Sequence, residues 1–237
     1  MPLLDTAVRE TAVPADEASH LTRVLRLGVG DEIAVFDGRG HEFRAKVVSA
    51  ARGKVRIELI DAIDPVPEAR VPITLVQAVL KGDKMDDVVR DATMMGVAAI
   101  EPIVTARTIA RGKRIDNDRW GRVAVASAKQ CRRAVVPTIA AIRDFTDWLA
   151  SSAHGLRLML VEPSAADPDI GSLHVLENHA AGSLALIVGP EGGWSPEERQ
   201  QADRAGCVAV TLGGLTLRAD AVAVAAMSIA RFALRDL

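Results

Sequence analysis

The segment Leu186–Glu198, LIVGPEGGWSPEE, carries the strongest local signal in this chain of 237 residues. The apolar residues before Gly189 predict a buried strand that ends at that glycine. The glycines of the turn allow the backbone to approach a ligand closely. Ser195 has Glu198 three residues later, which is the spacing of a capping box, and Pro196 occupies the first helical position. The segment therefore predicts a buried strand, a glycine-rich turn and a helix.

Short apolar runs alternate with helical or turn-rich stretches through the second part of the chain. The predicted strands are Pro72–Leu80, Ile100–Val104, Leu156–Val161, Leu184–Val188 and Cys207–Leu212. A helix is predicted at Met85–Met95, ending at Gly96. Strands that alternate with helices indicate a mainly parallel sheet, and ligands bind such sheets beyond the carboxyl ends of the strands. The loops after Val161, Val188 and Leu212 are therefore the candidate site.

The first part of the chain has the pattern of a small β-rich domain. Apolar and polar residues alternate in three predicted strands, Asp31–Phe36, His41–Ala50 and Lys54–Ile60. The glycines of Asp37–Gly40 predict a hairpin turn between the first two strands, and Glu17–Leu27 has the apolar spacing of a short helix. The proline-punctuated stretch Asp64–Glu68 predicts a linker. We therefore expect one domain at residues 1–68 and an α/β domain at residues 69–237.

The spacing of the glycine turn does not by itself identify a ligand. It matches neither the GxGxxG fingerprint of dinucleotide sites nor the Walker pattern of ATP sites, and Glu191 would repel a phosphate. From glycine spacing alone, a purely structural turn is favoured.

A second glycine-containing segment, Thr211–Ala221, leads into the apolar stretch Val222–Leu234. That stretch predicts a helix that is either an ordinary buried C-terminal helix or a dimer interface, and the sequence favours neither. Arg218 stands alone among small and apolar residues at the start of this helix. An isolated arginine in such a position indicates a contact with a ligand or a partner.

Basic residues are concentrated in the middle of the chain, although the net charge is −2. Ten of them fall between Val104 and Arg143, opposed only by Asp116 and Asp118: Arg107, Arg111, Lys113, Arg114, Arg119, Arg122, Lys129, Arg132, Arg133 and Arg143. The spacing predicts that Lys129, Arg132 and Arg133 share one side of a helix. A solvated helix face is the ordinary explanation of such a run, but like charges on one face favour an anionic partner.

Several classes of protein are excluded or disfavoured. The apolar stretch Ala221–Ala230 is too short to span a bilayer, and the N-terminus lacks the layout of a signal peptide, so we expect a cytoplasmic protein. The two cysteines have no CxxC spacing and the five histidines no paired metal spacing, so no metal site is expected. A GxSxG nucleophile elbow is absent from the sequence, which disfavours hydrolase chemistry.

The two C-terminal segments resemble the RsmE family of SPOUT-class RNA methyltransferases. The resemblance is carried by Gly189–Gly193 together with Leu212-Gly213 and Leu217-Arg218. It extends to His20–Leu27, Gly30-Asp31, Asp37-Gly38, Lys81–Met85, Ala128–Arg133 and Pro137. The chain departs from the family where Ala219-Asp220-Ala221-Val222 replaces the usual Thr-Glu-Thr-Ala and where Lys129 replaces a commonly acidic residue.

The resemblance implies an S-adenosylmethionine-dependent enzyme that methylates N3 of a uridine in 16S ribosomal RNA of the small subunit. It implies a PUA-like β-barrel that binds RNA at residues 1–68, a SPOUT domain with a trefoil knot at residues 69–237, and a homodimer formed through the C-terminal domain. The cofactor-binding residues would be Glu162, Val188, Gly189, Pro190, Gly192, Gly193, Leu212, Gly213, Leu217 and Arg218.

The catalytic and RNA-binding residues follow from the same resemblance and from the chemistry of the reaction. Uridine N3 must lose a proton, and the charge that spreads onto the uracil oxygens must be stabilised. Arg218 is the preferred hydrogen-bond donor, and either Asp220 or Glu191 could assist deprotonation. The expected RNA-binding residues are His20, Arg23, Arg26, Gln130, Arg132 and Arg133.

Two other functions remain open from the sequence. A non-catalytic RNA-binding factor for ribosome assembly could keep the same fold without turnover. A small-molecule α/β enzyme could use the glycine turn for a nucleotide.

Overall fold

The computed structural model describes residues 9–51, 54–109, 117–152, 155–165, 170–178 and 182–236. The chain forms two compact units. The small unit comprises Met1–Pro67 and Ala128–Val136, and the large unit comprises Glu68–Ser127 and Pro137–Leu237. The sequence placed a boundary after Glu68, but it gave no sign that a later segment belongs with the first residues.

A backbone pairing accounts for the return of residues 128–136 to the small unit. The amide of Gly40 donates to the carbonyl of Ala134 at 3.2 Å, and the amide of Val136 donates to the carbonyl of Gly38 at 2.9 Å. These bonds use polar groups of the hairpin turn that the hairpin itself leaves unpaired. Because the partners are backbone atoms, side-chain patterning could not reveal the pairing.

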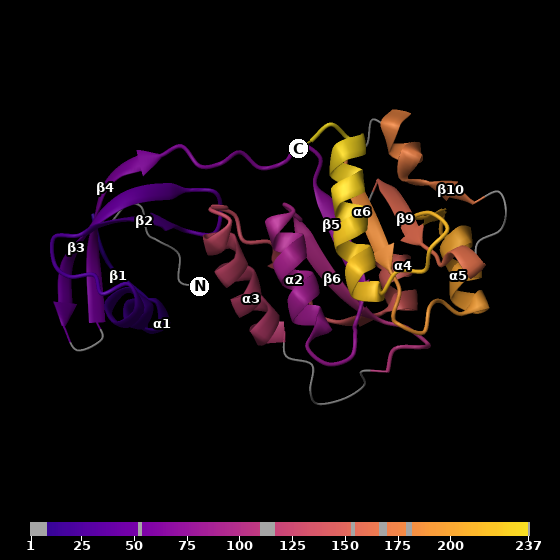
Figure 1. Ribbon diagram of the computed structural model, residues 1–237, viewed down its shortest axis with the longest axis horizontal. Coiled ribbons are helices and arrows are strands. Elements are labelled where there is room, and N and C mark those ends of the chain that lie inside the picture. The colour runs from indigo at the N-terminus through magenta and orange to yellow at the C-terminus, as the bar shows by residue number, and fades with distance from the viewer. Residues whose placement is uncertain are drawn as a thin grey trace. The chain divides into compact units, whose positions relative to one another are not determined.

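The small unit contains a four-stranded antiparallel sheet (Figure 1). Its strands are β1 (Glu10–Ala12), β2 (Glu32–Phe36), β3 (Glu42–Ala51) and β4 (Lys54–Ile63), and their order in the sheet is β1-β4-β3-β2. Ala45 and Val47 of β3 pack with Val55 and Ile57 of β4 and with Ala18. The period of two along these strands directs the apolar side chains to one face, as the sequence predicted.

The helix of the small unit is irregular. It begins as α1 (Ala15–Ser19) and continues as a π-helical turn, η1 (His20–Val24), in which the amide of Leu25 bonds to the carbonyl of His20 at 3.1 Å. Arg26 then takes a φ of +56°, which ends the helix. The predicted helix at Glu17–Leu27 therefore begins two residues earlier, widens and stops three residues sooner.

The large unit is built on a parallel sheet whose central strands are buried on both faces. Its strands are β5 (Ile73–Ala78), β6 (Ala99–Val104), β7 (Thr138–Ile139), β8 (Arg143–Asp144), β9 (Leu156–Leu160), β10 (Gly171–Ser172), β11 (Leu184–Val188) and β12 (Val208–Thr211). Their order is β10-β12-β9-β11-β5-β6-β7, and β8 also pairs with β6. The strand pairs of this sheet are parallel among the described residues, which confirms the predicted fold class.

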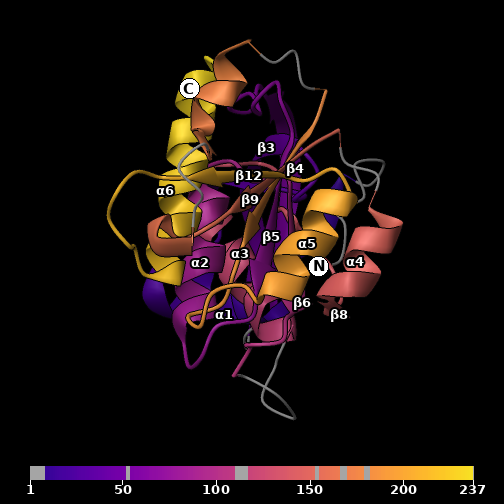
Figure 2. The ribbon, with the colours of Figure 1, turned by 90° about the vertical axis from the view of Figure 1, so that its right-hand side faces the viewer.

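Helices cover both faces of this sheet (Figures 1 and 2). On one face α2 (Lys84–Met94) packs beside α6 (Ala219–Ala233), and on the other α4 (Phe145–Ser151) packs beside α5 (Pro196–Arg204). Helix α3 spans Asn117–Gln130, and short 3₁₀ turns lie at Pro163–Ala165 (η2) and Leu173–Asn178 (η3). Phe145 and Trp148 of α4 are buried and pack against the sheet. The layers hold the ends of the central strands in fixed positions.

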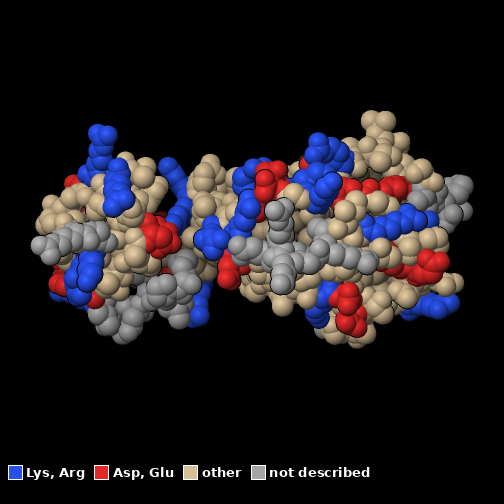
Figure 3. Space-filling model, turned by 90° about the horizontal axis from the view of Figure 1, so that it is seen from below, with Lys and Arg blue, Asp and Glu red and all other residues tan. Residues whose placement is uncertain are grey.

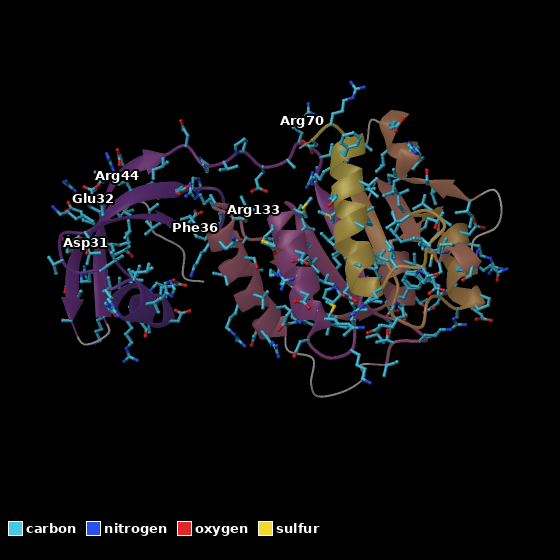
Figure 4. The ribbon with its side chains drawn as sticks, viewed as in Figure 1. Asp31, Glu32, Phe36, Arg44, Arg70 and Arg133 are labelled. Atoms are coloured by element: carbon cyan, nitrogen blue, oxygen red, sulfur yellow. The ribbon has the colours of Figure 1, made fainter. Side chains whose placement is uncertain are left out.

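The C-terminus of the large unit is fastened to the segment that precedes β5. Arg231 and Asp236 are both buried and form an ion pair of 3.0 Å. Arg231 also donates to the carbonyls of Val71 and Gly96 at 2.7 and 2.6 Å, while Asp236 accepts the amides of Arg70 and Val71 at 2.9 and 3.0 Å. Figure 4 shows Arg70 next to the C-terminal end of α6. The guanidinium of the buried Arg231 therefore stabilises the fold by joining α6 to the segment before β5.

Candidate active site

A cavity of about 200 Å³ lies at the carboxyl ends of β9, β11 and β12 in the large unit. The loops that follow these three strands form its walls, which is where a parallel sheet places its ligands. Of the predicted cofactor-binding residues, those that line the cavity are Glu162, Val188, Gly189, Pro190, Gly193, Leu212, Leu217 and Arg218. Gly192 and Gly213 belong to the same loops but do not line it. The structure therefore brings the two glycine-containing segments together around one space.

The turn after β11 is held by the helix that follows it. Ser195 accepts the amide of Glu198 at 3.2 Å, and Glu198 accepts the amide of Ser195 at 2.9 Å, which confirms the predicted capping box. The second oxygen of Glu198 accepts the amide of Ala106 at 2.7 Å. The guanidinium of Arg107 donates to the carbonyl of Gly192 at 2.9 Å. The loop after β6 therefore supports the glycine turn from outside.

Two glycines of this turn stand where a side chain would not fit. A Cβ on Gly189 would come within 2.9 Å of the ring of Trp194, and a Cβ on Gly193 would come within 2.5 Å of Glu162 Oε1. Gly193 also has a φ of +67°, a conformation that glycine adopts without steric cost. These close approaches leave backbone atoms, rather than side chains, facing the cavity.

Glu191 forms an ion pair inside the turn. Its Oε1 accepts Nζ of Lys84 at 2.9 Å and the amide of Lys81 at 3.2 Å. Burial favours the protonated carboxyl, but the hydrogen bonds from Lys84 and from backbone amides outweigh it, and the pKa of Glu191 lies below its usual value. Its other oxygen, Oε2, is buried and makes no hydrogen bond within the described part of the chain. Glu191 is thus an anion with one free acceptor.

The second segment closes the cavity from the side of α6. Thr211 Oγ1 donates to the carbonyl of Gly213 at 3.2 Å, and Gly213 has a φ of +108°, so the chain turns sharply after β12. Arg218 is the residue before the first turn of α6, and its Nε lies 3.2 Å from Oδ1 of Asp220. The side chain of Arg218 is 72% exposed and that of Asp220 is 22% exposed. The guanidinium of Arg218 at the cavity is therefore paired with the carboxylate of Asp220, which does not itself line the cavity.

The comparison with known proteins agrees with this geometry. A family model described as an RNA methyltransferase domain matches residues 67–231, and a model described as an RNA methyltransferase PUA domain matches residues 13–60. Ribosomal RNA small subunit methyltransferase E of Mycobacterium bovis is 33% identical over 226 residues, which cover 91% of this chain and 83% of the relative. The chain belongs to the ribosomal RNA small subunit methyltransferase E family.

Other members of this family extend the likeness. The protein of the same name from Synechocystis is 30% identical over 200 residues, which cover 84% of this chain and 65% of that relative's length. The crystal structure of ribosomal RNA small subunit methyltransferase E from Neisseria gonorrhoeae, described as bound to S-adenosyl methionine, has a TM-score of 0.85 at 29% identity and covers 98% of this chain and 95% of that one.

Ten residues that line the methyltransferase cavity were not predicted from the sequence. Lys84 lines the cavity and forms an ion pair with Glu191. Only the run Lys81–Met85 of the family resemblance pointed to this part of the chain. Trp194 fixes the turn by donating from Nε1 to the carbonyl of Leu160 at 2.8 Å, and no pattern pointed to that acceptor. The remaining residues that line the cavity without having been predicted are Leu160, Val161, Pro163, Thr211, Leu215, Thr216, Ala219 and Val222.

The residues that the family resemblance assigned to RNA lie in the small unit. His20, Arg23 and Arg26 are exposed on η1 and the turn after it. Gln130 is exposed at the end of α3, and Arg132 is exposed two residues further on. Arg132 has a φ of +60°, and Arg133 is buried at 8% exposure with partners of its own. Five of the six residues predicted to bind RNA are therefore exposed on the small unit, and Arg133 is buried.

The predicted sharing of one helix face by Lys129, Arg132 and Arg133 is wrong. Helix α3 ends at Gln130, and the left-handed backbone at Arg132 turns the chain away from the helix. Lys129 is neutralised by an ion pair with Glu17. The helical spacing predicted a common face because it assumed three more residues of helix than the chain forms.

Other basic residues of the middle segment are also paired within the chain. Arg119 forms ion pairs with Asp83 and Asp86, and Arg143 lies 3.5 Å from Glu101. Basic and acidic side chains are interspersed over the large unit in the view of Figure 3. Arg111, Lys113 and Arg114 fall outside the described residues. Three basic residues of the run, Arg119, Lys129 and Arg143, thus form ion pairs within the chain.

No group of three or more His, Cys, Asp or Glu side chains in the described ranges could hold a metal ion. Among the same residues, no helix has the length and apolar character that crossing a membrane requires.

Proposed function

We propose that this protein is an S-adenosylmethionine-dependent methyltransferase that acts on N3 of a uridine in 16S ribosomal RNA of the small subunit. The observation that carries the proposal is that the loops after β9, β11 and β12 meet around one cavity in a chain of the ribosomal RNA small subunit methyltransferase E family. A relative of known structure is described as bound to S-adenosyl methionine. The proposed site of reaction is the cytoplasm, where small subunits would be the substrate.

The residues around the cavity fit such a cofactor. Gly189 and Gly193 leave backbone groups facing the cavity, because a Cβ at either position would collide with Trp194 or Glu162. Leu212, Leu217 and other apolar side chains form walls suited to an adenine ring. The buried, unpaired Oε2 of Glu191 is an acceptor that a polar group of a ligand can satisfy. S-adenosylmethionine supplies an electrophilic methyl group on a positively charged sulfur.

The chain's own residues would bind, orient and exclude water from the reacting groups. Arg218 reaches the rim of the cavity with an exposed guanidinium, so it can donate to the uracil oxygens onto which negative charge spreads. A preorganised donor of this kind acts only where charge develops, and therefore accelerates the chemical step. Positioning and the exclusion of water supply the rest of the acceleration.

Asp220 is the better of the two candidate bases. Glu191 is held by Lys84 and the amide of Lys81, and its lowered pKa makes it a weak acceptor for the proton on N3. Asp220 lies half-buried in the first turn of α6, and its Oδ1 accepts Nε of Arg218 at 3.2 Å. We therefore assign proton removal to Asp220 and hydrogen bonding to the uracil oxygens to Arg218.

The small unit is proposed to hold the RNA. His20, Arg23, Arg26, Gln130 and Arg132 are exposed there, and four of them bear or can bear a positive charge. Contacts of this type with phosphates position an RNA without reading its sequence. Arg133 is buried, so its proposed part is to support this surface.

A homodimer through α6 and a trefoil knot complete the proposal. Ile229 and Phe232 of α6 are 41% and 74% exposed, whereas the other residues of this mostly apolar helix are buried or half-buried. Such side chains support a contact between two copies of the chain. The knot rests on the resemblance to the SPOUT class.

The test is methylation of undermodified small ribosomal subunits. The protein is incubated with radiolabelled S-adenosylmethionine and subunits that lack the modification, and the labelled base is then mapped. Label on N3 of one uridine supports the proposal. Binding of S-adenosylmethionine without label in any RNA would favour a non-catalytic assembly factor, and binding of ATP or NAD in its place would favour a small-molecule enzyme.

A further inference from the structure

Four ionisable side chains line the cavity, and only three of them have an oppositely charged partner. The four are Lys84, Glu162, Glu191 and Arg218. Lys84 and Glu191 form an ion pair of 2.9 Å, and Arg218 forms one of 3.2 Å with Asp220 at the rim. Among the described residues, the carboxylate of Glu162 has no ion-pair or hydrogen-bond partner. Each of the other charges therefore has a counter-charge, and the cavity retains a single unbalanced carboxylate.

The position of Glu162 is set by the backbone on both sides of it. It follows β9 directly after Val161, and it is half-buried. Its carboxylate lies against Gly193, where a Cβ would come within 2.5 Å of Oε1 and 3.0 Å of the carboxyl carbon. The glycine leaves room for the carboxylate between the loops that follow β9 and β11. A charge in this partly dry place acts more strongly than the same charge in water.

We propose, on the basis of the proposed function, that Glu162 is the residue by which this cavity distinguishes the charged methyl donor from its neutral product. S-adenosylmethionine carries a sulfonium, an ammonium and a carboxylate, so its net charge is positive. S-adenosylhomocysteine has a thioether instead of the sulfonium and no net charge, but it is otherwise the same molecule. An unbalanced carboxylate in the cavity therefore favours the donor and lets the product leave after each turnover.

The test compares the two ligands on one variant. Glu162→Gln removes the charge and keeps the size and most of the hydrogen-bonding capacity of the side chain. Isothermal titration calorimetry of the full chain gives the dissociation constants of S-adenosylmethionine and S-adenosylhomocysteine. We expect the preference for the donor to fall by about tenfold, the scale of one charge pair at partial exposure, and the affinity for the product to stay near its original value.

Matched variants separate this effect from a general one. Glu197→Gln removes the same charge from an exposed position on α5 that does not line the cavity, and it should leave the preference unchanged. Glu162→Asp keeps the charge and should keep most of the preference. Sinefungin carries a protonated amine near the position of the sulfonium. Its affinity relative to that of S-adenosylhomocysteine should therefore fall in the Glu162→Gln variant by the same factor as the relative affinity of the donor.

Each other outcome overturns the inference. A Glu162→Gln variant with an unchanged preference would show that the charge plays no part in selecting the donor. An equal loss of both ligands would assign Glu162 a role in the shape of the cavity. If the unaltered protein binds neither ligand, the proposed function fails as well, and that result is distinct from the other two.

Discussion

Gly189 and Trp194 are in direct contact across the turn that follows β11. A Cβ on Gly189 would lie 2.9 Å from Cε2 and 3.0 Å from Nε1 of the indole. Trp194 has little freedom to yield, because its Nε1 donates to the carbonyl of Leu160 and its ring packs at 4.9 Å from that of Phe145. The absence of a side chain at Gly189 thus sets the distance between the turn and the end of β9.

The first prediction concerns the substitution Gly189→Ala. The added methyl group must displace a buried indole, so we expect a loss of stability of about 1–3 kcal/mol and weaker binding of S-adenosylmethionine. Trp194→Phe provides the matched test, because the smaller ring leaves room for the methyl group. In a double-mutant cycle followed by urea unfolding, the combined variant should lose less than the sum of the two single losses. Additive losses would show that the contact is not the cause.

Gly213 and Gly214 form a natural pair for the second prediction. At neither position would a Cβ meet another atom within 4 Å, but only Gly213 has a positive φ, of +108°. Gly213→Ala should therefore cost about 1–2 kcal/mol through the backbone alone and weaken S-adenosylmethionine binding, whereas Gly214→Ala should be close to neutral. Thermal unfolding and ligand titration of the two variants measure this. Equal effects would indicate that the turn adapts to a side chain.

The sequence predicted the parts of this fold that depend on local patterns. Leu184–Val188 is a strand with those bounds, because five consecutive apolar residues before a glycine suit a strand that is buried on both faces. The capping box of Ser195 and Glu198 was also predictable, because both of its hydrogen bonds join residues three positions apart. The predicted convergence of the two glycine segments followed from the parallel sheet, whose strand ends share one edge.

The features that the sequence did not predict depend on contacts between distant residues. The ion pair of Lys84 with Glu191 joins residues 107 positions apart, and no local pattern selects that partner among the other charges. The prediction that Lys129, Arg132 and Arg133 share one helix face was wrong for the same reason. The helix stops at Gln130, and Glu17, far away in the sequence, neutralises Lys129. Spacing describes neighbours along a helix, but it does not indicate where the helix ends or what packs on it.

The third prediction concerns the pH dependence of stability at the C-terminus. Burial raises the pKa of Asp236, but the amides of Val71 and Arg70 and the charge of Arg231 outweigh it, so the pKa lies below its usual value. A depressed pKa contributes stability above the unfolded value of about 3.9, and this contribution is lost as the pH falls toward the folded value. Asp236 therefore stabilises the fold at neutral pH and progressively less in acid.

Asp236→Asn should destabilise the protein by about 3 kcal/mol at neutral pH, because it leaves the buried guanidinium of Arg231 without its counter-charge. The difference from the unaltered protein should shrink below about pH 4. Urea unfolding across this pH range provides the measurement. Asp87→Asn, which removes an exposed carboxylate paired with Arg90, is the control and should change stability little. A difference that does not vary with pH would contradict the ion-pair explanation.

The fourth prediction concerns the binding of RNA by the small unit. If Arg23 and Arg26 contact phosphates, the logarithm of the affinity for 16S RNA should fall linearly with the logarithm of the salt concentration. Each contact contributes a slope of roughly 0.7–0.9. Arg23→Ala and Arg26→Ala should each reduce the slope by the roughly 0.7–0.9 that one phosphate contact contributes. Arg56→Ala on β4, whose guanidinium already pairs with Glu10 at 3.3 Å, is the control and should leave the slope unchanged. A slope unaffected by the first two variants would remove this surface from the RNA site.

The last prediction separates the proposed roles of Arg218 and Asp220. Arg218→Ala removes an exposed side chain, so the fold should be retained, but methylation of small subunits should fall by about 10²–10³ if the guanidinium stabilises charge on the uracil. Arg218→Lys keeps the charge but not the planar pair of donors, and it should recover only part of the rate. Arg204→Ala, at the end of α5, is the matched control for loss of one exposed arginine.

Asp220→Asn should also reduce the rate, but with a different signature. If Asp220 removes the proton from N3, raising the pH should partly restore turnover in the variant, because uridine then ionises without assistance. The Arg218→Ala variant should show no such recovery, since it lacks a donor rather than a base. Single-turnover rates measured across a range of pH with saturating S-adenosylmethionine provide the comparison. Matching pH profiles for the two variants would mean that the 3.2 Å contact between these residues acts as one unit, and that Asp220 only orients Arg218.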